Sequence, residues 1–169
     1  FSDGIYGGRD VQKISTCQTD AFDSKDFGGM GYMVDGVPYF YNDSVKCHTT
    51  ETEFDVSSLK ELPKVGVAYF TIDADPEILD YYKESGVQGI VIAGAGSGCY
   101  SEQWNNKIDE LAETGIPVVR CSRIGSGVIT QDDYFIGNIA RGNDLAPQKA
   151  ATLLRLILTV TNDIEQVQN

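Results

Sequence analysis

The stretch Gln88–Gly89–Ile90–Val91–Ile92–Ala93 is the part of the sequence that decides the fold. Its apolar run, which begins at Gly89, is typical of a strand buried on both faces, as in a parallel sheet. It continues into Gly94–Ala95–Gly96–Ser97–Gly98–Cys99, a Gly-rich segment that predicts a tight turn after the strand. The strand and its turn therefore predict a loop at the carboxyl end of an α/β sheet, where such folds bind ligands.

Similar apolar segments flank this strand. Val65–Phe70 and Ile116–Cys121 predict further strands. Between the strands, two helices are predicted: one starts at Asp75–Pro76 and stops at Gly86, and the next starts at Ser101 and stops at Gly115. A third helix starts at Pro147. Its apolar positions recur at helical spacing; they are Ala150, Leu153, Leu154, Ile157 and Leu158. The alternation predicts an α/β domain, a parallel sheet covered by helices on both faces, over residues 63–169.

The first third of the chain has a different pattern. Gly31–Val34, the dipeptide Asp35–Gly36 and Val37–Tyr41 together predict a β-hairpin with a tight turn. A segment of roughly 40 residues cannot bury a core of its own, so we expect residues 1–41 to pack on another part of the protein outside this sequence. Residues 42–62 are polar and are predicted to be a linker. Their Asn-x-Ser triplet, Asn42–Asp43–Ser44, is interpreted as a chance match to a glycosylation signal.

The composition restricts the class of protein. The 169 residues include 13 Lys and Arg and 25 Asp and Glu, a formal net charge of −12, with 41% hydrophobic residues. This balance is typical of a globular protein, and its negative field argues against nucleic acid and anionic membranes as partners. No apolar run has the roughly 20 residues that a membrane span needs. Because no secretory signal opens the chain, we expect a mature product or a fragment.

Few residues suggest catalysis by themselves. The chain has four cysteines, a single histidine, His48, and no C-x-x-C motif, and this pattern argues against a zinc site. Cys121 is expected to be a buried thiol. Lys13 follows Arg9–Asp10 and precedes several hydroxyl side chains, where a lysine can act as a base; solvated surface is the commoner role. The adjacent Asp132 and Asp133 are read as loop charges, and His48 as a structural residue.

Several sequence blocks identify a family resemblance. In order they are Gly8–Arg9–Asp10–Val11–Gln12–Lys13, Phe54–Asp55–Val56, Glu61–Leu62–Pro63–Lys64–Val65, Gly89–Ile90–Val91, Ala93–Gly94–Ala95–Gly96, Val119–Arg120–Cys121–Ser122–Arg123 and Pro147–Gln148–Lys149–Ala150. Together they resemble the carboxyl-terminal half of bacterial-type L-asparaginases, closest to the secreted type II branch. The resemblance implies a smaller flavodoxin-like carboxyl-terminal domain, preceded here by the tail of a larger α/β domain. The family's T-G-G-T and T-D motifs are expected on an amino-terminal segment outside this sequence.

The resemblance also implies an activity. Members hydrolyse asparagine, and more weakly glutamine, through a threonine acyl-enzyme, without a cofactor or metal. Lys13 falls at the position of the lysine that assists this chemistry. A carboxyl-terminal-domain loop contacts the substrate's α-amino group in a neighbouring subunit, which implies a dimer of dimers of identical subunits. By resemblance the protein is expected to be secreted or periplasmic.

Two positions depart from the family pattern. Cys99 stands where the intersubunit loop carries Asn or Ser, with Ser97 two positions earlier, and Tyr134 stands where a glutamate contacts the substrate ammonium. A phenol is neutral at pH 7 and cannot replace a carboxylate as counter-ion, so Asp132 or Asp133 is a candidate substitute. These departures favour a second hypothesis, a non-catalytic binding or storage protein on the same fold. A third, a free-standing nucleotide-binding domain, is disfavoured because no phosphate-binding motif is present.

Overall fold

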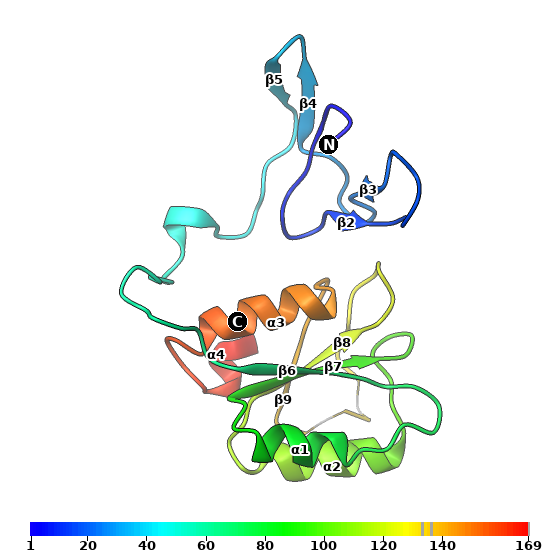
Figure 1. The fold of residues 1–169 in the computed structure, drawn as a ribbon, viewed down its shortest axis with the longest axis vertical. Helices are drawn as coiled ribbons and strands as arrows, with labels where there is room; N and C mark the ends of the chain where they lie inside the picture. Colours follow the sequence, from blue (N-terminus) through cyan, green and yellow to red (C-terminus); the bar gives the residue numbers. More distant parts are fainter. Residues whose placement is uncertain (133, 136, 169) are drawn as a thin grey trace. The chain divides into compact units, whose positions relative to one another are not determined.

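The structure, a computed structural model, describes residues 1–132, 134–135 and 137–168 and divides into two compact units (Figure 1). The first unit is Phe1–Glu53 and the second is Phe54–Asn169. The first unit contains short antiparallel strands and one 3-10 helix, whereas the second contains a parallel sheet and the α-helices.

The second unit is built on four parallel strands whose spatial order follows the sequence. They are β6 (Val65–Tyr69), β7 (Gly89–Gly94), β8 (Val118–Ser122) and β9 (Ile139–Arg141). The sheet confirms the predicted α/β class and the three predicted strands. The sequence did not predict β9, because three residues with one buried side chain, Ala140, give too short an apolar pattern.

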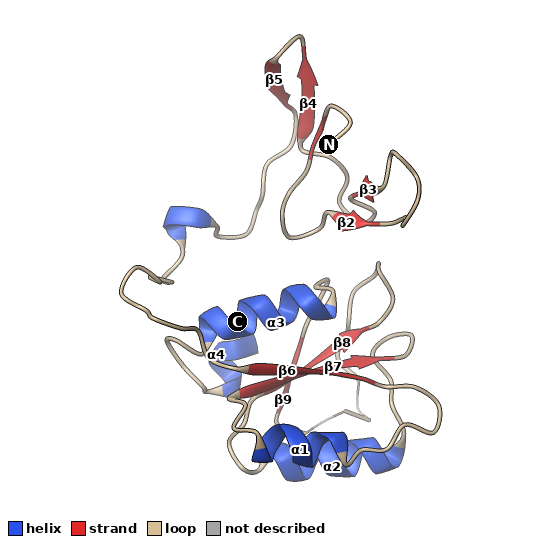
Figure 2. Cartoon of the chain, in the orientation of Figure 1, coloured by secondary structure: helices blue, strands red, loops and turns tan. Residues whose placement is uncertain are grey.

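Helices cover both faces of this sheet (Figure 2). One face carries α1 (Ile78–Glu84) and α2 (Glu102–Ala112), and the other carries α3 (Pro147–Ile157) and α4 (Ile164–Gln168). Because side chains alternate along a strand, Ile90 and Ile92 of β7 join the cluster beneath α1 and α2, while Val91 joins the cluster beneath α3. None of the helices in the described part of the chain is long and apolar enough to span a bilayer.

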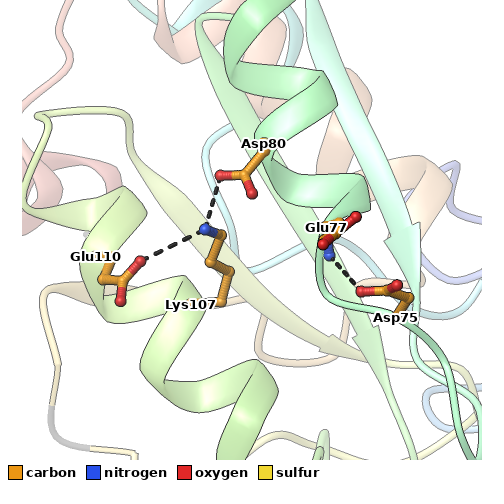
Figure 3. A network of polar contacts seen from close by, with 5 residues as sticks. All are labelled: Asp75, Glu77, Asp80, Lys107 and Glu110. Carbon is orange, nitrogen blue, oxygen red and sulfur yellow. Dashed lines mark hydrogen bonds and ion pairs between the residues drawn. The ribbon is translucent and has the colours of Figure 1, made fainter.

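The helix boundaries agree with the capping signals except at one end. The Ser101 side chain accepts a hydrogen bond from the Trp104 amide at 3.4 Å, and Pro147 is the first residue of α3, as predicted. The helix predicted from Asp75–Pro76 begins later, at Ile78. The Asp75 carboxylate does accept a hydrogen bond from the Glu77 amide at 3.0 Å (Figure 3), but the first turn is closed by a three-residue bond from the Leu79 amide to the Pro76 carbonyl at 2.9 Å.

A surface ion pair links the two helices that share a face of the sheet. Lys107 of α2 lies 2.8 Å from the Asp80 carboxylate of α1 and 3.5 Å from that of Glu110 (Figure 3). Its hydrogen bond with Asp80 raises the pKa of Lys107. Exposed pairs of this kind add little stability, so the apolar cluster beneath them dominates the packing.

The first unit confirms the predicted hairpin. Strands β4 (Gly31–Val34) and β5 (Val37–Phe40) pair antiparallel, and the turn residues Asp35 and Gly36 have φ of 49° and 77°, the left-handed values that such two-residue turns need. The other strands of this unit are β1 (Gly4–Ile5), which pairs with β4, and the partners β2 (Gln12–Lys13) and β3 (Phe22–Asp23). A short 3-10 helix, Thr49–Glu51, is the only regular element among residues 42–62.

Apolar side chains of this hairpin are exposed on the unit itself. Tyr32 is 60% exposed, Phe40 62% and Tyr41 74%. Several large apolar side chains exposed on one short hairpin indicate a place where another part of a protein packs.

Substitution of Leu79 by alanine tests the packing between α1 and the sheet. Leu79 is fully buried, so Leu79→Ala should lower the free energy of unfolding by about 2–5 kcal/mol. The neighbouring Ile78 is 41% exposed, and Ile78→Ala should change the free energy by less than about 1 kcal/mol. Urea unfolding of the native protein measures both, with fluorescence of Trp104, which lies in the same cluster, as the probe. Equal losses for the two variants would contradict this packing.

Candidate functional site

The candidate site is built around the loop that follows β7. Ala95 and Cys99 exchange two backbone hydrogen bonds, of 2.8 and 2.7 Å, which close the loop. Gly96 and Gly98 have φ of +53° and +84°, so the predicted glycine-dependent turn is present. The closed loop leaves Ser97 and Cys99 exposed to solvent.

This loop folds back tightly on the end of its own strand. A Cβ atom on Gly94 would lie 2.3 Å from the carbonyl carbon of Gly98, closer than any real contact. A Cβ atom on Gly98 would lie 3.2 Å from the side chains of Arg120 and Ile129. The absence of side chains at these two positions therefore permits the close approach of the loop to β7 and β8.

Residues of β8 and just after it bind the backbone of the loop. The Arg120 guanidinium donates to the Ser97 carbonyl at 3.0 Å, and the Ser122 hydroxyl donates to the Gly96 carbonyl. The Arg123 amide donates to the Gly94 carbonyl at 2.9 Å. The sequence analysis gave none of these residues a role. The available signal was an arginine within an apolar strand, since a buried arginine must find acceptors.

Arg120 also binds the second candidate segment. Its other terminal nitrogen donates to the Thr130 carbonyl at 2.9 Å, and its guanidinium carbon lies 4.3 Å from the centroid of the Phe135 ring. The side chain is only 2% exposed. One buried guanidinium thus joins the Gly-rich loop to the chain that leads to Asp132 and Tyr134.

Two buried polar atoms near this position have no hydrogen-bond partner in the described part of the chain. They are Nε of Arg120 and the hydroxyl of Tyr100, whose ring lies 4.8 Å from that of Phe135. Burial raises the pKa of Tyr100, and the neighbouring Arg120 partly opposes this effect. The buried Tyr100 hydroxyl thus lies close to the Arg120 cation.

Asp132 and Tyr134 are both exposed, and the side chain of Asp132 binds the backbone of Tyr134. The Asp132 carboxylate accepts a hydrogen bond from the Tyr134 amide at 2.9 Å, and the Tyr134 ring lies 4.8 Å from that of Phe135. The adjacent Asp133 lies outside the described residues. The structure thus connects Ser97 with the Asp132 segment through Arg120.

A cavity lies beside the edge strand β9. Its volume is about 510 Å³, and its walls include Arg120, Asp132, Phe135, Arg141 and Gln168. Gln168 of α4 accepts hydrogen bonds from the backbone amide of Arg141 at 2.7 Å and from its Nε at 3.1 Å. Ser97, Cys99 and Tyr134 do not line this cavity, but Arg120, Asp132 and Phe135 do, so the cavity adjoins the candidate site.

The other predicted residues belong to the first unit. Lys13, in β2, is exposed, and its Nζ lies 4.9 Å from the centroid of the Phe22 ring. Ser15 accepts a hydrogen bond from the Gln18 amide at 3.1 Å. His48 is exposed and pairs with the Thr49 hydroxyl at 3.3 Å, in agreement with a structural residue.

The titratable groups do not form a metal centre in the part of the chain that the structure describes. No three His, Cys, Asp or Glu side chains there are placed to hold a metal ion. The four cysteines are free, and Cys121 is buried as predicted. Burial raises the pKa of the Cys121 thiol to about 12, which disfavours its thiolate.

Several known proteins are similar to this chain along nearly its whole length. L-asparaginase 2 of Bacillus subtilis is 39% identical over 99% of this chain and 45% of its own length. A probable periplasmic L-asparaginase of Haemophilus influenzae is 37% identical over 97% of this chain and 48% of its own length. The solved structure of a probable cytoplasmic L-asparaginase from Campylobacter jejuni matches with a TM-score of 0.92 and 38% identity, over 98% of this chain and 55% of that one.

These matches cover only part of each relative. The chain spans about half the length of the curated relatives that it matches. Residues 64–169 match the family described as the glutaminase/asparaginase C-terminal domain, which confirms the resemblance inferred from the sequence blocks. The chain therefore belongs to the glutaminase/asparaginase family.

Proposed function

We propose that this chain is the carboxyl-terminal part of an L-asparaginase-type amidohydrolase that converts asparagine to aspartate and ammonia. The observation that carries the proposal is the similarity to L-asparaginases along 99% of the chain, including both units. The arrangement of the second unit supports it, because the Gly-rich loop exposes Ser97 and Cys99 at the carboxyl end of a parallel sheet.

The proposed reaction proceeds through an acyl-enzyme. A threonine hydroxyl on the amino-terminal segment attacks the side-chain carbonyl carbon of asparagine, the C–N bond breaks, and ammonia leaves after protonation. Water then hydrolyses the ester and releases aspartate. Lys13 is the proposed catalytic residue of this chain and assists proton transfer at the second threonine and the aspartate of the amino-terminal segment.

The substrate contacts are proposed to cross a subunit boundary. Ser97 or Cys99, with Asp132, Asp133 or Tyr134, would lie near the α-amino group of a substrate bound to a neighbouring subunit. Such contacts require at least a dimer, and a dimer of dimers is the proposed assembly. We propose a secreted or periplasmic location. Of the relatives named above, the Haemophilus influenzae protein is described as periplasmic and the Campylobacter jejuni protein as cytoplasmic.

The amino-terminal segment is proposed to pack on the exposed hairpin of the first unit. The exposed apolar residues on both strands of the hairpin have a composition suited to the core of a larger domain. The chain spans less than half of the Bacillus subtilis relative, which leaves ample length for that domain.

A non-catalytic binding or storage protein is the second candidate. Cys99 and Tyr134 favour it, because neither residue type matches the family pattern at the substrate loop. The native mass of the assembly and the release of ammonia from asparagine distinguish the two candidates. An intact tetramer that binds asparagine but releases no ammonia would support the second.

Expression of residues 1–169 alone tests the proposed partner. Without the amino-terminal segment, the exposed hairpin should leave the chain aggregated or partly molten. Near-ultraviolet circular dichroism and urea unfolding measure this, with the chain co-expressed with its amino-terminal segment as the control. A cooperative transition with a native-like spectrum for the isolated monomer would contradict the prediction.

Substitution of Lys13 by methionine tests the catalytic assignment. Lys13→Met should reduce turnover of asparagine by about 10²–10⁴-fold, because a positioned proton-transfer group is lost. The oligomeric state should not change. Lys25→Met, at another exposed lysine of the first unit, is the matched control and should retain full turnover. Turnover of Lys13→Met within threefold of the parent would show that Lys13 is only a surface charge.

Three substitutions test the counter-ion of the substrate ammonium. A carboxylate contact exceeds a neutral phenol contact by about 1–2 kcal/mol. Tyr134→Glu should therefore tighten asparagine binding roughly five- to thirtyfold, measured by calorimetry. Asp132→Asn and Asp133→Asn should change it little if no carboxylate serves the site.

The other outcomes identify a different residue. Loss of binding in Asp132→Asn or Asp133→Asn would make that aspartate the counter-ion. Parent-like binding in all three variants would show that this segment does not reach a substrate amine, and would favour the non-catalytic candidate.

A further inference from the structure

We propose that Arg120 is a positioning residue that holds the two candidate substrate-binding segments, the Gly-rich loop 95–99 and the segment 129–132, in a single geometry. The inference rests on the proposed function for its effect on substrate. Its structural basis lies entirely within the second unit.

The guanidinium binds one backbone carbonyl of each segment. One terminal nitrogen donates to Ser97 at 3.0 Å and the other to Thr130 at 2.9 Å. A planar group with its donors in a fixed fork sets the distance between its two acceptors. Movement of either segment therefore strains the hydrogen bond between that segment and Arg120. Because the fork is rigid, the hydrogen bond to the other segment is strained as well.

The position of the guanidinium is itself fixed. The Phe135 ring lies 4.3 Å from its central carbon, a cation–π contact that is strengthened by burial. On the opposite end of the side chain, Gly98 lies so close that a Cβ atom there would be 3.2 Å from Cγ of Arg120. The arginine is thus held by the loop that it positions and by the residue that follows Tyr134.

The composition of the site argues for a geometric role. A buried cation that contacts neutral carbonyls and an aromatic ring contributes less net stability than an apolar side chain of the same size often would. The two carbonyls it binds belong to the segments that carry Ser97 and Asp132. A lysine lacks the fork and cannot hold both carbonyls at the spacing set by arginine.

Arg120→Lys in the full-length native protein tests the proposal. If Arg120 positions the ammonium contacts, KM for asparagine should rise about 10- to 100-fold, as expected for misplaced binding groups, while kcat stays within about threefold. Arg155→Lys is the matched control: Arg155 also donates to a backbone carbonyl, that of Pro63, at 3.1 Å, but outside the two segments. It should leave both parameters unchanged.

Hydrogen exchange supplies a readout that does not depend on activity. In Arg120→Lys, amides of peptides covering 95–99 and 129–132 should both exchange at least about tenfold faster, while the α1–α2 layer keeps its protection. If the parent releases no ammonia, the proposed function fails, and the exchange result still decides whether Arg120 couples the segments.

Three results would overturn the proposal. They are unchanged exchange in either segment, faster exchange spread over the whole unit, or an unchanged KM in an active protein. If Arg120→Lys does not fold, Phe135→Leu replaces it, because this variant keeps the arginine and removes only the ring that fixes its plane. The same two segments should then lose protection together, and failure to do so would also reject the coupling.

Discussion

Complete burial of β7 is the constraint on which the second unit depends. All six of its residues, Gly89–Gly94, are buried, so neither face of the strand can contact water. One layer of helices is not enough for such a strand, and both the α1–α2 layer and α3 are required. The chain next becomes exposed to solvent beyond the carboxyl end of β7, where the polar side chains described above bind the loop.

Polar groups at that end are satisfied mainly by contacts between side chains of one strand and backbone of its neighbours. β8 supplies Arg120 and Ser122, and Arg123 follows directly. Their acceptors are carbonyls at the ends of β6 and β7 and in the loops beyond, including Phe70, Gly96 and Ser97. Hydrogen bonds of this kind keep backbone carbonyls paired where the sheet ladder has ended.

The sequence predicts the parts of both units that follow from apolar pattern, capping and turn residues. The strands at 65–70 and 116–121 and the hairpin turn at Asp35–Gly36 were predictable because each has a local chemical signal. Strand β9 and helix α4 were not, since both are short and gain their stability from tertiary packing. The role of Arg120 depends on which carbonyls lie beside it, a property of the folded chain that its neighbours in sequence do not reveal.

The path of the Gly-rich loop has a consequence for how such a protein can change in evolution. The loop is fixed by glycines and by hydrogen bonds to its main-chain carbonyls, whereas the side chains of Ser97 and Cys99 are exposed. Residues at these two positions can be exchanged without altering the backbone that presents them. The side chains at these two positions can therefore vary at little cost to stability, while substitution at Gly94 or Gly98 would deform the loop itself.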